Sequence, residues 1–583
     1  MQTTSVRGKG HPILPANVTM DADSLGQAAN KPFQSIALPF SFDTTCPETV
    51  QATVSNEINR TVFAVLDALD AKTCEEASLR MRSVKELDLS SRELVDLTPL
   101  KGLPPNVTYL ELFGNKVTDL SPLKFTYLRN LGAGNNLISD LTPLTKLDLE
   151  SLSIGNNPIL DYSVLRTLSK LNYLDLSSSD LTRGINLSSE TIRRLDLSFC
   201  GIQDLKQVIL PTNIITLYIN GNPLTDITGL AQQKTLKSIL LDSVPVNNLA
   251  ALGELTDLQN LGLLDVAATD LTPLSKLKKL EQLSFRSTNE TEPIDFSPLR
   301  DLASLKRVFI SETRFSDLSV LGNSINIELL TVLESTVSDI SILTRFSKLR
   351  EVELSGAPIT SSSAIGLMPS LEVFNCDACN LTDISFMANF PNLISSSLSR
   401  NPFTSIETLK TLGKLNKIHL EGTSVTDLSP LNSLPSLADI DLSGLPFEII
   451  GQISAPQRIR TLRFSASNIA DLKGMEAFSS LNVLDISGNR VADLTPIAKL
   501  PLTELVMNSN PVLDLQPIAS MKTLQKIDMS STQVQNLVPL RVLPLTKLLA
   551  FRIPLGTTIQ KSPANCPTEL NIAFPLQRFC RNP

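Results

Sequence analysis

The sequence lacks several residue types on which common protein chemistries depend. Its 583 residues contain no tryptophan, five tyrosines and two histidines. Aromatic residues make up 5% of the chain and hydrophobic residues 42%, so aliphatic side chains must supply most of the core. Histidine is the commonest general acid or base in enzymes. A chain this poor in histidine therefore offers little material for a catalytic centre.

Basic residues and long apolar runs are also scarce. Acidic residues outnumber basic ones 59 to 51, which gives a net charge of −8. Binding to a phosphate backbone needs clustered lysine and arginine, so we do not expect nucleic acid as a ligand. No segment approaches the roughly 20 apolar residues of a membrane helix, so we expect no membrane insertion. Residues 1–30 contain no apolar run longer than Ile13-Leu14, which is too short for a secretory signal.

The chain instead repeats one pattern about every 22 residues between residues 84 and 547. Residues 107–123 read VTYLELFGNKVTDLSPL, and residues 481–497 read LNVLDISGNRVADLTPI. This period and the Leu-x-x-Leu-x-Leu spacing are typical of leucine-rich repeats. The pattern predicts an α/β solenoid, a horseshoe with a parallel sheet on its concave side and short 3₁₀ turns on its convex side. The 21 repeats begin at Val84, Val107, Leu128, Leu149, Leu171, Ile192, Ile214, Leu236, Leu258, Leu280, Leu305, Ile327, Leu349, Leu371, Leu393, Leu415, Leu437, Ile459, Leu481, Leu502 and Leu524.

Each position of the repeat has an expected role. Positions 4 and 6 alternate with polar residues and should point into the core from a short strand. Position 9 is asparagine in seven repeats and should form a ladder of hydrogen bonds to the backbone. Position 13 is aspartate in 14 repeats, and its carboxylate can accept hydrogen bonds from nearby backbone N–H groups. The Ser/Thr-Pro pair that follows predicts a helix N-cap at the serine or threonine, with proline at the first helical position. Stacked at about 4.8 Å, 21 strands give an arc of roughly 100 Å.

Both ends of the array carry atypical sequence, as the ends of a solenoid must. We expect a polar leader over residues 1–45, an N-terminal cap over 46–83, the solenoid over 84–547 and a C-terminal cap over 548–583. Apolar residues at helical spacing predict a cap helix over roughly 48–71. Cys46 and Cys74 flank that helix, and Cys566 and Cys580 follow the last repeat, so we expect one disulfide at each end.

The other three cysteines lie inside repeats. Cys200 and Cys379 occupy position 9, and Cys376 occupies the inward position 6. The spacing of Cys376 and Cys379 also matches a redox or zinc motif. We favour the structural interpretation, in which one is a core side chain and the other a member of the ladder, and all three thiols are free.

The 22-residue pattern resembles the SDS22-like subfamily, which includes bacterial internalins and a phosphatase-1 regulatory subunit. The caps resemble those of bacterial secreted leucine-rich-repeat proteins, in Cys46-Pro-Glu-Thr-Val50, in residues 73–90 and in the tail from Asn565 to Cys580. The resemblance implies a non-enzymatic, monomeric recognition or adhesion scaffold that binds a protein or a glycan outside the cytoplasm. The alternative is a cytosolic scaffold that regulates a phosphatase or another enzyme.

A search for reactive groups finds one candidate on the expected concave sheet. His419 has Ser397, Glu421 and Asp441 at neighbouring positions, but we favour the simpler explanation that these are ordinary exposed strand residues. The sequence contains no phosphate-binding loop and no glycine-rich calcium repeat. We therefore expect no catalytic residues, no metal and no cofactor.

The concave positions 3, 5 and 7 predict where a partner binds. Large apolar residues fill six of 18 such positions in the six repeats between residues 214 and 348, and six of 45 in the other fifteen. Apolar patches with charged borders often mark interfaces, although chance clustering of so few residues would give the same count. A longer repeat near Asn289–Pro293 points to the same region. The candidate binding residues are Tyr218, Leu240, Leu264, Arg286, Arg307, Phe309, Leu329 and Leu333.

Overall fold

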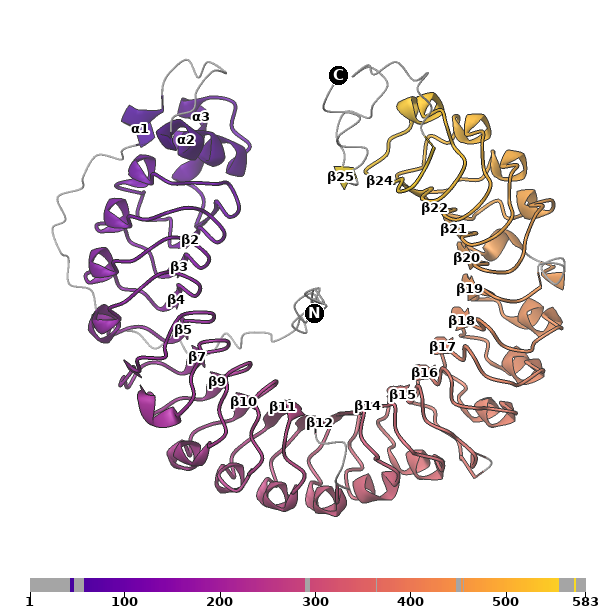
Figure 1. Cartoon of the computed structure of the whole chain (residues 1–583), viewed down its shortest axis with the longest axis horizontal. Helices are drawn as coiled ribbons and strands as arrows, with labels where there is room; N and C mark the ends of the chain where they lie inside the picture. The colour runs from indigo at the N-terminus through magenta and orange to yellow at the C-terminus, as the bar shows by residue number, and fades with distance from the viewer. Residues whose placement is uncertain are drawn as a thin grey trace, which may run out of the picture.

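A computed structural model of the chain describes residues 42–46, 57–288, 294–362, 364–446, 452–454, 456–554 and 571–572. Within these ranges, 23 parallel strands form one sheet that lines the inside of a curved array (Figure 1). Short 3₁₀ turns line the outside. Successive strands pair in sequence order, so that each repeat touches only its neighbours, as in other solenoids. The α/β solenoid predicted from the repeat pattern is confirmed.

The strands of the main sheet recur once per repeat. Their bounds are β1 Glu86–Asp88, β2 Tyr109–Glu111, β3 Asn130–Gly132, β4 Ser151–Ser153, β5 Tyr173–Asp175, β7 Arg194–Asp196, β9 Thr216–Tyr218, β10 Ser238–Leu240, β11 Asn260–Val266, β12 Gln282–Ser287, β13 Arg307–Ser311, β14 Leu329–Leu333, β15 Glu351–Glu353, β16 Val373–Asn375, β17 Ser395–Ser397, β18 Lys417–His419, β19 Asp439–Asp441, β20 Thr461–Arg463, β21 Val483–Asp485, β22 Glu504–Val506, β23 Lys526–Asp528, β24 Lys547–Leu549 and β25 Asn571–Ile572. Two further strands, β6 (Ile185–Asn186) and β8 (Val208–Ile209), pair with each other in a separate small sheet.

The core is a continuous column of aliphatic side chains. Leu484 and Ile486, at positions 4 and 6 of their repeat, are essentially fully buried, and the same positions are buried in the other repeats. Position 9 forms the predicted ladder. In a typical rung, the Asn136 amide donates to the carbonyl of Leu112 in the preceding repeat at 2.9 Å, and its oxygen accepts from the N–H of Val117 at 3.0 Å. Each rung therefore ties two neighbouring repeats together through buried backbone groups.

The turn into each 3₁₀ segment differs from the expectation in one respect. The Asp493 carboxylate accepts from the N–H of Thr495 at 2.8 Å, as predicted for position 13. The expected Ser/Thr N-cap is wrong, because Thr495 is itself the first residue of the 3₁₀ segment η18 (Thr495–Ile497), and the residue before it makes no side-chain cap. The aspartate two residues upstream satisfies the free N–H instead, and it can do so because its side chain closes an Asx turn.

The N-terminal cap contains the helices α1 (Phe42–Thr45), α2 (Glu57–Ala68) and α3 (Cys74–Met81). The cap helix expected over 48–71 is present as α2, and residues 47–56 lie outside the described ranges. The Thr61 hydroxyl of α2 donates to the carbonyl of Asp96 at 2.6 Å, which attaches the cap to the first repeat. A disulfide joins Cys46 to Cys74, the expected pair. The other expected pair, Cys566 and Cys580, lies outside the described residues.

The expectation of free thiols at Cys376 and Cys379 is wrong. The two residues form a disulfide, and both are fully buried. The physical reason is that positions 6 and 9 both face the core where the chain leaves the strand, with their Cα atoms only 5.5 Å apart. Cys200 is the free cysteine among the described residues, and its thiol donates to the carbonyl of Leu176 at 3.1 Å as a rung of the ladder.

The sheet also runs past the last of the 21 expected repeats. β24 pairs in register with β23, and β25 pairs with β24. Residues 545–552 repeat the strand and the turn of the preceding copies, including a left-handed residue, Arg552, at position 8. The parallel ladder therefore extends beyond residue 547.

Candidate functional site

The concave side of the sheet presents side chains at positions 3, 5 and 7 of each repeat. Strand pairing fixes which of them are neighbours. On β9 and β10, Tyr218 and Leu240 lie directly opposite each other. Leu264 follows on β11, two residues beyond Gly262, the partner of Leu240. All three apolar side chains are half-buried.

Leu240 leans over Gly262. A Cβ atom built on Gly262 would lie 2.6 Å from Cδ2 of Leu240, so a larger residue at this position would displace the leucine. The glycine thus lets the leucine lie flat against the sheet beside Tyr218. We call Tyr218, Leu240 and Leu264 the first apolar group.

The remaining apolar candidates lie on β13 and β14. Phe309 faces Thr331, which stands between Leu329 and Leu333 on β14. We call Phe309, Leu329 and Leu333 the second apolar group, and all three side chains are half-buried. Ser284 of β12 is the partner of Gly262 on one side and of Phe309 on the other, so a polar strand separates the two groups.

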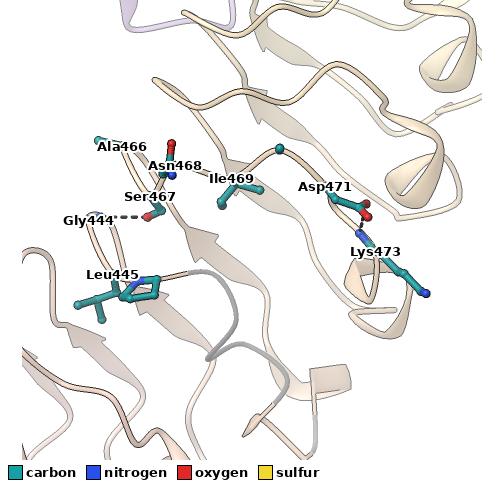
Figure 2. A pocket seen from close by; sticks show the side chains of 10 residues that line it. Gly444, Leu445, Ala466, Ser467, Asn468, Ile469, Asp471 and Lys473 are labelled. Carbon is teal, nitrogen blue, oxygen red and sulfur yellow. Dashed lines mark hydrogen bonds between the residues drawn. The ribbon is translucent and has the colours of Figure 1, made fainter.

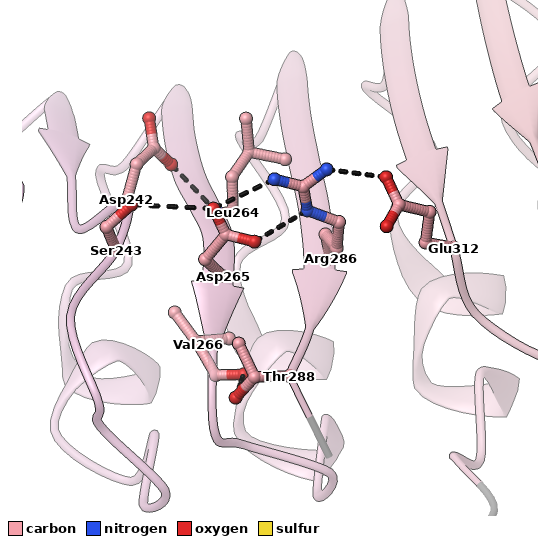
Figure 3. A network of polar contacts seen from close by, with 8 residues as sticks. All are labelled: Asp242, Ser243, Leu264, Asp265, Val266, Arg286, Thr288 and Glu312. Atoms are coloured by element: carbon pink, nitrogen blue, oxygen red, sulfur yellow. Dashed lines mark hydrogen bonds and ion pairs between the residues drawn. The ribbon is translucent and has the colours of Figure 1, made fainter. Parts of the chain in front are cut away.

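Arg286 occupies position 7 on the separating strand. Its Nε and Nη2 atoms donate to the two oxygens of Asp265 at 2.7 and 2.8 Å, and Nη1 donates to Glu312 at 2.6 Å (Figure 3). The Asp265 carboxylate is the main cause of the raised pKa of Arg286. A carboxylate one strand further on, Asp242, accepts from the N–H of Leu264 at 2.8 Å, and burial raises its pKa. This network fixes the arginine between the two apolar groups.

Arg307, the other predicted cation, behaves differently. It is exposed, and no ion pair to it is found among the described residues. It borders a shallow hollow of about 200 Å³ that Leu329, Glu351 and Val373 also line. Its partner in register is Leu329, whose partner on the far side is Glu351.

The strands beneath this region are longer than elsewhere. β11 to β14 have seven, six, five and five residues, whereas most strands of the main sheet have three. The extension begins at an irregularity in the pairing of β11 with β12, between Leu263 and Val266, where Asp265 adopts a left-handed backbone (φ 60°). The 22-residue repeat pattern does not predict these longer strands. The residue type gives no signal, because Ser287 holds position 8 in an extended backbone while Ser243, at position 8 of another repeat, is left-handed.

The concave rows also carry the net charge of the chain. Counting positions 3, 5 and 7 from β1 to β24, there are fifteen carboxylates and seven lysines or arginines, a difference of −8. The rest of the sequence contains 44 acidic and 44 basic residues. The carboxylates are those of Glu86, Asp88, Glu111, Asp175, Asp196, Asp242, Glu351, Glu353, Asp377, Glu421, Asp439, Asp441, Asp485, Glu504 and Asp528, and the cations are Arg194, Arg286, Arg307, Lys417, Arg463, Lys526 and Lys547.

The residues around His419 do not form a catalytic triad. Nε2 of His419 lies 3.9 Å from Asp439, whose carboxylate accepts from Arg463 at 2.8 Å. The hydroxyl of Ser397, the nearest candidate nucleophile, donates to Asp377 at 2.6 Å instead. Within the described ranges, no cluster of histidine, cysteine, aspartate and glutamate has the geometry of a metal site. No described helix is long and apolar enough to cross a membrane.

A larger cavity, of about 640 Å³, lies at the turns that follow β19 and β20 rather than on the strands (Figure 2). Gly444, Leu445, Ser467 and Ile469 line it, and its charged groups are Asp471 and Lys473. Asp471 accepts from the N–H of Lys473 at 2.9 Å, so this carboxylate serves the turn. The cavity contains none of the residues that the sequence singled out.

Comparison with known proteins identifies the repeats. A family model of two leucine-rich-repeat copies matches residues 105–146, and a single-repeat model matches residues 188–205. These matches fall on copies of the same 22-residue ladder that builds the whole sheet. The chain is a leucine-rich-repeat protein.

Several solved structures are similar to this leucine-rich-repeat protein. An internalin (inlF) from Listeria monocytogenes is 20% identical, with 85% of this chain and 99% of that chain covered and a TM-score of 0.24. The functional domain of InlJ from Listeria monocytogenes is 18% identical over 74% of this chain and 84% of that chain, with a TM-score of 0.41. A leucine-rich-repeat protein of Leptospira interrogans is 17% identical over 79% and 94%, with a TM-score of 0.36. A search of curated protein sequences gives no match.

Proposed function

We propose that this leucine-rich-repeat protein is a recognition or adhesion scaffold that binds a protein partner through the centre of its concave sheet. The observation that carries the proposal is the set of six half-buried apolar side chains on the concave face of β9 to β14. They surround Arg286, whose side chain is already held by two carboxylates. Apolar and arginine anchors fixed before binding are typical of the centre of an interface, because little side-chain freedom is lost on association.

The longer strands support the same location. Additional ladder hydrogen bonds from β11 to β14 make this part of the sheet the most extensively paired. A recognition surface on such a support keeps its side chains in place, and this lowers the entropy cost of binding.

The proposal places the protein outside the cytoplasm. Disulfides at Cys46–Cys74 and Cys376–Cys379 support this location, because structural disulfides persist in oxidising compartments and are rare in the cytosol.

The experiment compares capture by the full chain and by a variant of the patch. The chain is immobilised and exposed to surface material of the cells that produce it, and bound proteins are quantified by mass spectrometry. Tyr218→Ala/Phe309→Ala should abolish capture of the specific partner and leave the protein folded, because both side chains lie on the concave surface and not in the core between the repeats. Val483→Ala/Val506→Ala, also concave but outside the patch, is the matched control. Equal capture by all three proteins would refute the proposal.

A further inference from the structure

Two carboxylates adjoin the second apolar group without a cationic partner. Glu351 lies on β15 directly opposite Leu329, and Glu353 lies directly opposite Thr331. Glu351 is exposed. Glu353 accepts from the N–H of Ser355 at 3.2 Å. Neither carboxylate forms an ion pair with any lysine or arginine in the described part of the chain.

Four other carboxylates of this region differ in this respect. Glu372, on the edge of the next strand, accepts from Arg350 at 2.7 Å, and Glu281 pairs with Lys306 at 2.8 Å. Asp265 and Glu312 share Arg286. These four carboxylates are thus neutralised within the protein, while Glu351 and Glu353 leave two negative charges beside Phe309, Leu329 and Leu333.

We propose that the second apolar group together with Glu351 and Glu353 is the binding site for a basic protein segment, one that carries lysine or arginine next to a large apolar side chain. This inference rests on the proposed function and specifies the chemistry of the partner. The partner's apolar side chain packs on Phe309, Leu329 and Leu333. Its ammonium or guanidinium group pairs with Glu351 and Glu353.

The spacing of the site fits such a segment. Neighbouring strands are about 4.8 Å apart, so the carboxylates of β15 stand one strand from the leucines of β14. Side chains at i and i+2 of an extended segment are about 6.5 Å apart on one face, so one segment can fill both parts of the site.

Charge complementarity over the whole concave face favours the same partner. The concave rows hold fifteen carboxylates and seven cations, and the remainder of the chain is balanced. A basic partner is therefore attracted towards the inside of the arc rather than to its outer surface, while an acidic partner is repelled from it. The charged residues on β13 to β16 are Arg307, Glu351 and Glu353, and none of them has an ion pair in the described part of the chain. An acidic partner would therefore meet one free positive group and two free negative groups on these strands.

The test selects ligands for the intact protein from a random 12-residue peptide library displayed on phage. Enriched peptides are synthesised, and their affinities are measured for four proteins: the natural sequence, Phe309→Ser/Leu329→Ser, Glu351→Gln/Glu353→Gln, and Asp485→Asn/Glu504→Gln. The last variant removes two concave carboxylates on β21 and β22 and is the matched control for net charge. Circular dichroism and thermal melting verify that each variant folds.

We expect peptides that depend on Phe309 and Leu329 to combine lysine or arginine with a large apolar residue. Their affinity should fall at least about tenfold in Glu351→Gln/Glu353→Gln and less than about twofold in the control. Patch-dependent peptides that are neutral or acidic, or that bind Glu351→Gln/Glu353→Gln unchanged, would overturn this inference and leave the proposed function standing. If no enriched peptide depends on Phe309 and Leu329, this inference fails, while the proposed function is decided by the capture experiment with Tyr218→Ala/Phe309→Ala.

Discussion

The guanidinium of Arg286 on β12 forms a bidentate ion pair with the carboxylate of Asp265 on β11, with Nε–Oδ1 at 2.7 Å and Nη2–Oδ2 at 2.8 Å. Asp265 lies where the regular pairing of the two strands is interrupted and the backbone turns left-handed. The contact therefore closes an irregular part of the sheet and orients a cation on the concave face.

Replacing this arginine by lysine should loosen the two strands. A lysine ammonium group cannot reproduce the planar bidentate geometry of the guanidinium. Because the pair is about one-third exposed (side-chain values of 31% and 35%), we expect a loss of only about 1 kcal/mol in the free energy of unfolding. Hydrogen exchange followed by mass spectrometry should show faster exchange in β11 and β12. Arg129→Lys, in a more exposed pair with Glu150, is the control; equal exchange in both variants would contradict the prediction.

Asn222 should be among the most sensitive positions of the ladder. It is 1% exposed, accepts from the N–H groups of Cys200 and Ile202, and donates to the carbonyls of Leu197 and Ile219. Asn222→Ala leaves these buried backbone groups without hydrogen-bond partners. We therefore expect the free energy of unfolding, measured by urea titration, to fall by about 2–4 kcal/mol.

The matched control for this ladder position is Asn416→Ala. The Asn416 amide makes a single exposed bond to the carbonyl of Ser436, and its removal should cost less than about 1 kcal/mol. Equal effects of the two alanine variants would show that the buried rungs do not stabilise the array.

The column of aspartates at position 13 should make the protein sensitive to acid. Hydrogen bonds from the Thr495 hydroxyl and N–H lower the pKa of Asp493, and bonds from Ser429 lower that of Asp427. A carboxyl group whose pKa is lower in the folded state stabilises the fold above its unfolded pKa of about 4, and this stabilisation is lost as the pH falls through the folded pKa. The melting temperature should therefore be steady from pH 7 to 5 and fall steeply below pH 4.

The Asp427→Asn/Asp493→Asn variant tests the origin of that fall. It should melt at a lower temperature than the natural protein at pH 7. Between pH 7 and pH 3 its melting temperature should fall by less, because the two substituted turns no longer titrate. Glu75→Gln/Glu190→Gln removes two charges outside these turns and should leave the slope unchanged. An identical slope in all three proteins would assign the acid sensitivity to other groups.

Thiol titration should find one reactive cysteine in the unreduced, denatured chain. Cys46–Cys74 and Cys376–Cys379 are bonded in the structure, and Cys566–Cys580 is expected to be, which leaves Cys200. In the native protein Cys200 should not react at pH 8, because burial raises its pKa to about 12. Cys200→Ser should give no reactive thiol after denaturation. Three thiols in the natural sequence would mean that one of the three disulfides is absent.

The repeat made most of this fold predictable. The register of Val107 and of its counterparts fixed the strands, the inward positions and the asparagine ladder, because each is a local consequence of the same 22 residues. Details that depend on two residues being close in space were not predictable. Cys376 and Cys379 were assigned separate roles by position, although the turn brings both sulfurs to one side of the core.

The candidate site was predictable only as a set of positions. Alternation placed Tyr218 and Phe309 on the concave face, but it did not show that Ser284 separates them into two groups. Nor did it show that Arg286 is already neutralised while Arg307 is not, because ion pairs join residues of different repeats. The SDS22-like subfamily, the limits of the caps and the identity of the binding residues stay predictions.

The curvature of the sheet limits what can be bound. Figure 1 shows the array bending through most of a circle, so that the cap helices α1 to α3 and the strands β24 and β25 face each other across a gap. An inner contour of 23 strands at about 4.8 Å each is about 110 Å long, and a closed circle of that length would have a diameter of about 35 Å, so the open arc is slightly wider. A folded domain of 100 residues is about as wide. A ligand that touches opposite arms of the arc at once must therefore be a small domain, or a narrow projection of a larger protein, that enters along the axis of the ring.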